Sequence, residues 1–314
     1  MARSPEPVCV WFYTRHENLR RILSLVASYR PPRLYLISDG PRGNRPQDAE
    51  LCRLARLAAE ESITWPCKVM RNYSDTNLGP KMRIVSGIDW VFQQEESAIF
   101  LEDDTIPHPT FFPYCEALLN HYRDDQRVMH VGGSNPLSGR VPCQDSYLFS
   151  RYFQIWGFAT WRRTWNMYDV NMTQWPRFRE ERALHAFYSQ EDMCRWMTNM
   201  FDSTFAGRTI TWDVQLFFAC LFNNGLSIVP CKNLISNIGY EGVHASASTD
   251  VHNMGLPVEP IDWANLKHPR YICPSFEYDD LFIKDNFATS RPTPRSPARG
   301  LYGRLRDYAA RANW

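Results

Sequence analysis

The chain has 314 residues, of which 44% are hydrophobic and 14% aromatic, enough apolar side chains for a large core. Its formal net charge of +1 provides no global attraction for nucleic acid, so we expect no nucleic-acid partner. No apolar run approaches the roughly 20 residues of a membrane-spanning helix, and the polar residues 1–7 do not resemble a signal peptide.

The nine cysteines are scattered along the chain and include no Cys-x-x-Cys pair. The lack of such pairs argues against a zinc site, and the odd count argues against a disulfide scaffold. A reducing compartment, and therefore a cytoplasmic location, is the simplest expectation.

The first 130 residues alternate short apolar runs with segments of helical periodicity. Strands are expected over 8–13, 34–38, 67–71 and 99–101, and the segment 14–17 fits a capping box at the start of the first helix. Each strand is followed by apolar residues at helical spacing, such as Leu19, Ile22, Leu23 and Val26 after the first. This alternation predicts an α/β fold with a mostly parallel sheet flanked by helices.

The second half is less regular. Residues 147–155 are rich in aromatic side chains, 180–200 are expected to form a helix, and a further helix opens at 211–213 and runs to Leu221. A short strand is expected over 226–229. The segment 237–252 is rich in Gly, Ser and Asn and is expected to be a loop, while Pro and Arg make 291–299 an extended linker.

The most informative motif is Glu102-Asp103-Asp104, which directly follows the apolar run Ala98 to Leu101. Such a position is the carboxyl end of a strand, where open α/β sheets bind their ligands. Three adjacent carboxylates repel one another, and a divalent cation such as Mg²⁺ or Mn²⁺ removes that cost. The motif therefore indicates a metal that can hold a diphosphate, although an acidic turn before a helix explains the same residues.

Arg15 and Asp39 follow the first and second expected strands, which places both on the same edge as the acidic triplet. The turn after the first strand lacks G-x-G-x-x-G, and the chain lacks a G-x-x-x-x-G-K-[ST] loop. A dinucleotide-binding site of the NAD type and a P-loop are therefore not expected.

In order along the chain, these motifs resemble those of GT-A-fold glycosyltransferases, close in pattern to N-acetylglucosaminyltransferase I and bacterial family-2-like enzymes. The resemblance spans about residues 8 to 250. The motifs that carry it are Arg15, Asp39, Phe100-Leu101-Glu102-Asp103-Asp104 with Pro109-Thr110-Phe111-Phe112, Trp156-Gly157-Phe158, Trp212-Asp213 and Gly242-Val243-His244. It implies a Rossmann-like GT-A domain over 1–290, with a nucleotide-sugar-binding half up to about 135 and an acceptor half over about 136–290.

For the donor, the resemblance implies Asp104 and His244 as ligands of Mn²⁺ or Mg²⁺, and Asp103 and Glu102 as contacts to ribose and sugar. Asp39 then binds the base, which favours a UDP-linked donor. Arg15 lies near the diphosphate or the sugar, and Lys81, at the start of a helix, is a candidate phosphate contact. Metal and cation together neutralise charge as the diphosphate leaves.

For the acceptor half, the resemblance implies that Asp213 is the general base of an inverting transfer to a glycan or lipid-linked hydroxyl. N-acetylglucosaminyltransferase I has two successive carboxylates after the Trp, whereas Val214 follows Asp213 here. A helix cap is the other explanation of Asp213. Trp156, Gly157, Phe158 and Trp212 are candidates for the sugar pocket.

Two questions remain open at this stage: the role of the tail and the functional class of the protein. The arginine-rich tail 291–314 is either a dock for an anionic membrane surface, which makes the protein peripheral at the inner membrane, or a solvated segment. The chain is either a glycosyltransferase or a sugar-nucleotide pyrophosphorylase, which should carry a Gly-rich basic loop after the first strand. A non-catalytic nucleotide-sugar-binding module is the third functional class.

Overall fold

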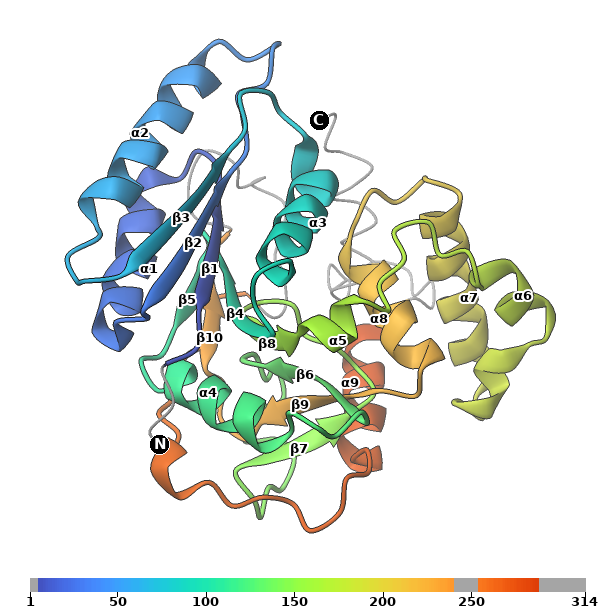
Figure 1. Ribbon diagram of the computed structural model, residues 1–314. Coiled ribbons are helices and arrows are strands. Elements are labelled where there is room, and N and C mark those ends of the chain that lie inside the picture. The colour runs from blue at the N-terminus through green and yellow to red at the C-terminus, as the bar shows by residue number, and fades with distance from the viewer. Residues whose placement is uncertain (1–4, 240–253, 288–314) are drawn as a thin grey trace, which may run out of the picture.

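The computed structural model of the protein describes residues 5–239 and 254–287, with one large β-sheet at its centre (Figure 1). The strands of this sheet are β1 (Val8–Phe12), β2 (Arg33–Ser38), β3 (Lys68–Tyr73), β4 (Ser97–Glu102), β6 (Val128–Gly132), β7 (Tyr147–Ser150), β8 (Phe158–Trp161) and β9 (Leu226–Pro230). Their order is β3-β2-β1-β4-β8-β6-β9-β7. A second, two-stranded sheet pairs β5 (Thr105–Pro107) with β10 (Ile235–Asn237).

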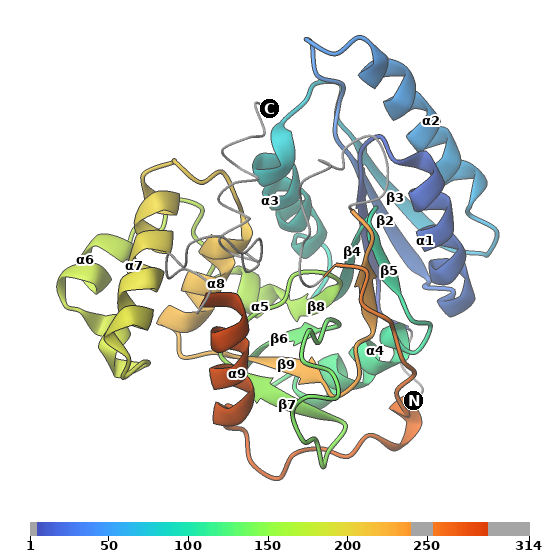
Figure 2. The same ribbon diagram turned by 180° about the vertical axis from the view of Figure 1, so that it is seen from behind.

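Helices cover both faces of the large sheet, as the front and back views show (Figures 1 and 2). The α-helices are α1 (His16–Tyr29), α2 (Gln47–Glu61), α3 (Gly79–Phe92), α4 (Phe111–His121), α5 (Arg162–Trp165), α6 (Trp175–Glu180), α7 (Glu191–Phe205), α8 (Asp213–Phe222) and α9 (Phe276–Phe287). Two 3₁₀ turns, η1 (Ala183–Ala186) and η2 (Trp263–Asn265), complete the elements. Within the described ranges, no helix is long and apolar enough to cross a membrane.

Alternation along the central strands builds two cores, because successive side chains of a strand point to opposite faces. Val10 of β1 and Leu101 of β4 belong to a core that includes residues of α1, α2 and α4. Trp11 and Phe100, one position away in each strand, belong to the other core, with residues of α3, α7 and α8. The inner parallel strands β1, β2 and β4 are therefore buried on both faces, as their continuous apolar sequences predict, whereas the edge strand β3 contains no fully buried residue.

The predicted α/β fold with a mostly parallel sheet is confirmed. Strands β3, β2, β1 and β4 pair in parallel, and β6 pairs in parallel with β9. Strands β8 and β7 run against their neighbours. Strand β8 lies between β4 and β6, so the two expected halves of the domain share one sheet.

Two local predictions were wrong. The expected capping box does not form: Arg15 occupies the N-cap of α1, and no side chain caps the helix in the described chain. The expected helix over 180–200 is broken, because Arg182 adopts a left-handed conformation with φ +51° and η1 and α7 follow as separate elements. A left-handed residue ends the helical hydrogen-bond ladder, which periodicity alone does not reveal.

One disulfide contradicts the expectation from the cysteine pattern. Cys143, in the loop before β7, pairs with Cys231, which directly follows β9, 88 residues later. Seven cysteines are free, and Cys273 is exposed among them. Spacing could not reveal the pair, because only the antiparallel pairing of β7 with β9 brings the two positions together.

The disulfide gives a simple chemical prediction. Without a reductant, iodoacetamide should modify Cys273 in the native protein and should leave Cys143 and Cys231 unmodified. After reduction under denaturing conditions all three should react. Peptide mass spectrometry measures each site, and alkylation of Cys143 before reduction would show that the two thiols are unpaired.

Candidate active site

The candidate site lies where the carboxyl ends of β1 and β4 meet. Trp11 of β1 is the register partner of Glu102 of β4, so the residues that follow the two strands emerge side by side at one edge of the sheet. This pairing brings the turn at 13–15 against the acidic triplet, as the sequence predicts for Arg15. Ligand sites of open α/β sheets lie at such an edge.

Arg15 bridges the two aspartates of the triplet. Its Nη1 lies 2.6 Å from Asp103 Oδ1 and 2.8 Å from Asp104 Oδ2, and the guanidinium group is mostly shielded from solvent. The backbone N–H of Tyr13 donates to Asp103 Oδ2 at 2.9 Å, so both oxygens of this buried carboxylate have partners. Tyr13 is not among the predicted site residues, because it contributes its backbone N–H, which the sequence pattern does not reveal.

One guanidinium group faces three carboxylates, and the charge is unbalanced. Burial, followed by the charges of Asp104 and Asp103, raises the pKa of Glu102 to about 8. Burial also raises the pKa of Asp104, although Arg15 opposes the shift. Protonation of Glu102 relieves the repulsion in the free protein, and a bound cation would relieve it in the same way.

A divalent cation fits this donor set only in part. Among residues 5–239 and 254–287, no group of three or more His, Cys, Asp or Glu side chains is placed to hold a metal. Mg²⁺ is commonly held by one or two carboxylates together with substrate phosphates, which needs no such group. Asp104, with Glu102 beside it, offers hard oxygen ligands of this kind.

Asp104 also borders the start of the segment that carries His244. The backbone N–H of Ile238 donates to the Asp104 carbonyl at 2.8 Å, next to the pairing of Asn237 with Thr105. A Cβ on Gly239 would lie 2.7 Å from Asp104 Oδ2, so the chain passes directly beside this carboxylate. His244 itself lies outside the described residues, and its role as a metal ligand stays a prediction.

Asp213 reaches the site from the first turn of α8. The ring of Trp212 contacts the rings of Trp11 (centroids 6.4 Å apart) and Phe158 (5.9 Å), on the sheet face below Glu102. Asp213 is close enough for its charge to raise the pKa of Glu102. Four carboxylates and one guanidinium group thus come from the end of β4, from the turns after β1 and β4, and from the start of α8.

Two aromatic candidates for the sugar pocket lie in the core. Trp212 is 5% exposed and Phe158 is 1% exposed, and Phe158 also stacks on Phe100 with centroids 5.1 Å apart. Packing explains both rings, which anchor α8 and β8 on the sheet. Trp156 is only partly buried, and its carbonyl accepts a hydrogen bond from Ser134.

Gly157 is required by a neighbouring side chain rather than by an open pocket. Its φ is +61°, and a Cβ there would lie 2.7 Å from Cγ1 of Ile235 in β10. Its carbonyl accepts the N–H of Gly133 at 2.8 Å. The close approach expected at this glycine therefore exists, but its partner in the described chain is Ile235.

Asp39 holds the turn before α3. Its carboxylate accepts the N–H groups of Gly40, Leu78 and Gly79 at 2.9–3.0 Å, and the side-chain amide of Asn77 at 3.1 Å. These contacts satisfy its oxygens without a base, so its predicted contact with the base stays a prediction. Lys81, two residues into α3, is partly buried, and burial lowers its pKa.

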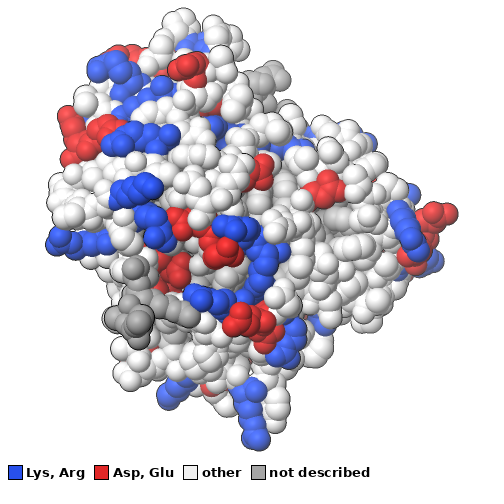
Figure 3. Space-filling model, viewed as in Figure 1, with Lys and Arg blue, Asp and Glu red and all other residues white. Residues whose placement is uncertain are grey.

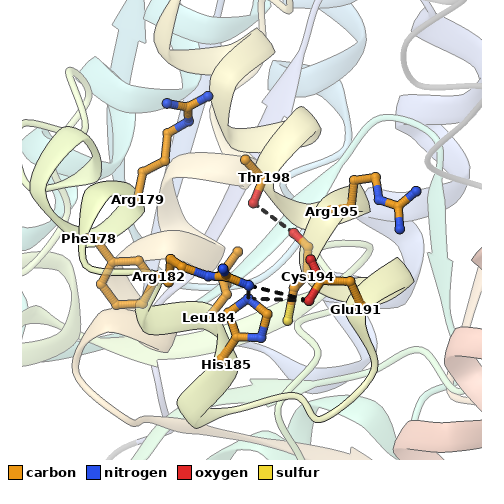
Figure 4. Close-up of a pocket in the computed structure, with 9 residues that line it drawn as sticks. All are labelled: Phe178, Arg179, Arg182, Leu184, His185, Glu191, Cys194, Arg195 and Thr198. Carbon is orange, nitrogen blue, oxygen red and sulfur yellow. Dashed lines mark hydrogen bonds and ion pairs between the residues drawn. The ribbon is translucent and has the colours of Figure 1, made fainter.

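A pocket lies away from this edge, in the helical region of α6, η1 and α7 (Figure 4). It has a volume of about 310 Å³. Arg182 and His185 both approach Glu191, at 3.5 and 3.7 Å, whereas Arg179 and Arg195 pair with acidic residues of their own. The basic side chains that line this pocket therefore all have acidic partners.

Acidic and basic side chains are also interspersed over the face of the molecule shown in Figure 3.

Comparisons with known proteins supply only distant likenesses. The chain matches no known protein family and no curated protein by sequence. Three solved structures share part of the fold: a 4-diphosphocytidyl-2C-methyl-D-erythritol synthase from Anaerococcus prevotii (10% identity, TM-score 0.33), a UDP-glucose pyrophosphorylase complexed with UDP-glucose (7%, 0.30) and an inositol-1-phosphate CTP transferase from T. maritima (10%, 0.31). They cover 52%, 52% and 53% of this chain, and 74%, 78% and 75% of their own. Such low scores carry no argument about activity.

Gly157 provides a stability prediction with a matched control. Gly157→Ala should destabilise the protein by about 2–4 kcal/mol, because strain at positive φ adds to overpacking against Ile235. Gly139→Ala should cost about 1 kcal/mol, because Gly139 also has positive φ (+76°) but has no atom within 4 Å of its Cβ position. Chemical denaturation measures both, and equal losses would rule out the contact with Ile235.

The raised pKa of Glu102 predicts that the stability of the folded protein depends on pH. Its pKa in the folded protein, about 8, lies above its ordinary value of 4.5, so the folded state holds the proton more tightly. Stability should therefore fall as pH rises from about 4.5 to 8. The glutamine in Glu102→Gln cannot ionise. Without added metal, the melting temperature of this variant should therefore rise relative to that of the wild type as the pH increases from 5 to 8.5. A constant difference across this range would contradict the raised pKa.

Proposed function

We propose that the protein is a metal-dependent glycosyltransferase that moves a sugar from a nucleotide-sugar donor, UDP-linked by preference, to a hydroxyl of a glycan or lipid-linked acceptor. The observation that carries the proposal is the meeting of Arg15, the triplet at 102–104 and Asp213 at one edge of the sheet. Cation and carboxylates suit a leaving diphosphate, and a separate carboxylate suits a hydroxyl nucleophile.

The donor end is proposed around Arg15 and Asp104. A divalent cation bound at Asp104 would supply charge neutralisation for the diphosphate. Arg15 Nη1 lies 2.8 Å from Asp104 Oδ2 and also pairs with Asp103. The guanidinium group can therefore donate a hydrogen bond to a phosphate oxygen while its ion pair with Asp103 holds it in place. Asp103 and Glu102 are proposed to bind the ribose and the transferred sugar.

The acceptor end is proposed around Asp213. Hydrogen bonds from the Thr211 hydroxyl and the Val214 N–H hold Oδ1. Within the described ranges no other residue donates a hydrogen bond to Oδ2, which is therefore the oxygen proposed to take the acceptor proton. The acceptor oxygen then attacks the anomeric carbon from the side opposite the diphosphate, which inverts the configuration.

A sugar-nucleotide pyrophosphorylase is the second candidate. It shares with the leading candidate the need for a nucleotide-sugar site at this edge of the sheet, and the solved structures resemble this chain too weakly to favour either reaction. The turn after β1, residues 13–17, carries no glycine-rich basic loop for the phosphates of a nucleoside triphosphate. This turn, together with the position of Asp213, favours glycosyl transfer.

The two reactions break different bonds, so their products decide between them. Glycosyl transfer cleaves the bond between the anomeric carbon and the diphosphate and releases a nucleoside diphosphate. A pyrophosphorylase transfers the nucleotidyl group to pyrophosphate and releases a nucleoside triphosphate and a sugar phosphate. Phosphorus NMR of UDP-sugars incubated with Mn²⁺, with and without pyrophosphate, distinguishes the two outcomes. Binding without turnover in every mixture would identify a binding module.

Asp213→Asn tests the proposed base. The amide oxygen can still accept the hydrogen bond of the Val214 N–H, but the amide cannot take a proton, so transfer should fall about 10²–10⁴-fold. Donor affinity, measured by calorimetry, should stay close to that of the wild type, because Asp213 acts on the acceptor. Asp104→Asn is the comparison variant, and it should instead weaken metal-dependent donor binding. Near-normal transfer by Asp213→Asn, or a retained anomeric configuration, would exclude Asp213 as the base.

A further inference from the structure

We propose that Thr211 is the positioning residue for Asp213: its hydroxyl fixes Oδ1 and so presents Oδ2 to the acceptor. The inference rests on the proposed function, because it assigns a partner to the proposed base. Thr211 belongs to none of the motifs that suggested the site.

The local geometry holds the carboxylate from two sides. The Thr211 hydroxyl and the Val214 N–H (2.9 Å) both donate to Oδ1, so this oxygen has two partners, and no other described residue donates a hydrogen bond to Oδ2. Between the two residues, Trp212 is anchored against Trp11 and Phe158. The backbone on which Thr211 and Asp213 stand is therefore fixed to the sheet.

The Thr211 hydroxyl also affects the pKa of Asp213. Burial raises the pKa of Asp213, and the hydrogen bond from Thr211 opposes that shift because it favours the ionised form. Among the described residues, the charge of Asp213 raises the pKa of Glu102 of β4 and of Tyr168, which follows α5. Glu102 lies next to Arg15, Asp103 and Asp104, whose charges also influence it. Tyr168 stays neutral because burial and the charge of Asp213 raise its pKa.

A helix cap alone is the competing explanation, since a threonine before a helix often stabilises its first turn. Capping and positioning differ in what they change. Loss of a cap lowers stability and leaves the pH dependence of the carboxylate as it was. Loss of a positioning hydroxyl raises the pKa of Asp213, and it does so whether or not the melting temperature changes.

The test compares Thr211→Val, Thr211→Ser and a control. Valine keeps the shape and removes the hydroxyl, serine restores it, and Thr204→Val removes a hydroxyl that donates to the Met200 carbonyl within α7. The first measurement is a carbon NMR titration of the Asp213 carboxyl, assigned by its absence in Asp213→Asn. The second is the pH dependence of glycosyl transfer. Thermal melts accompany each variant.

Thr211→Val should raise the pKa of Asp213 by about one unit, because one hydrogen bond to the charged form is lost. In the plot of transfer rate against pH, the rise on the acidic side should shift by the same amount. At a fixed pH below the pKa of Asp213, the rate of Thr211→Val should then be about tenfold lower than that of the wild type. Thr211→Ser and Thr204→Val should titrate as the wild type does. An unchanged Asp213 titration in Thr211→Val overturns the inference, whatever the activity. A shifted titration in a protein that transfers no sugar refutes the proposed function and supports the hold of Thr211 on Asp213.

Discussion

The Arg15 bridge is the interaction on which the candidate site depends. Asp103 and Asp104 follow one strand and would repel each other without a shared cation. Arg15, which follows the neighbouring strand, supplies it. Removal of one partner of such a shielded cluster leaves uncompensated charge, which is costlier than the loss of an exposed pair. The bridge also fixes the acidic turn to the start of α1, so the edge of the sheet and the first helix form one rigid unit.

The second constraint is aromatic. Trp11, Phe100, Phe158 and Trp212 pack on one face of the sheet, with Trp11 stacked on Phe100 at 5.3 Å and Phe158 beneath Trp212. They come from three strands and from the position before α8. This packing is what carries Asp213 to the edge where the triplet lies. Substitutions in these rings would therefore affect the site by moving α8, although the rings themselves are buried.

Part of this arrangement could be predicted from the sequence. Arg15 and the triplet each follow an apolar strand, and the parallel order of β1 and β4 brings strand ends together, so their proximity follows from local pattern and a general rule. Strands β6 and β8 were not predicted, because their short apolar runs gain a partner only through pairing between distant segments. The packing of Phe158 and Trp212 depends on that pairing too. The Cys143–Cys231 disulfide was missed for the same reason, since spacing carries no information about which strands become neighbours.

The position of β8 has a consequence for how the chain acquires its structure. Among the strands of residues 5–239 and 254–287, β6 pairs with β8 and β9 alone, so the strands of residues 5–135 do not form this sheet by themselves. During synthesis β4 presents an open edge until Phe158–Trp161 has emerged, and β6 waits for Leu226–Pro230 as well. Unpaired edges are sites of aggregation, and long-range pairing is slow. The nascent first half therefore exposes an unpaired sheet edge until the later strands are made, and a cut near residue 135 would separate β4 and β6 from their shared partner β8.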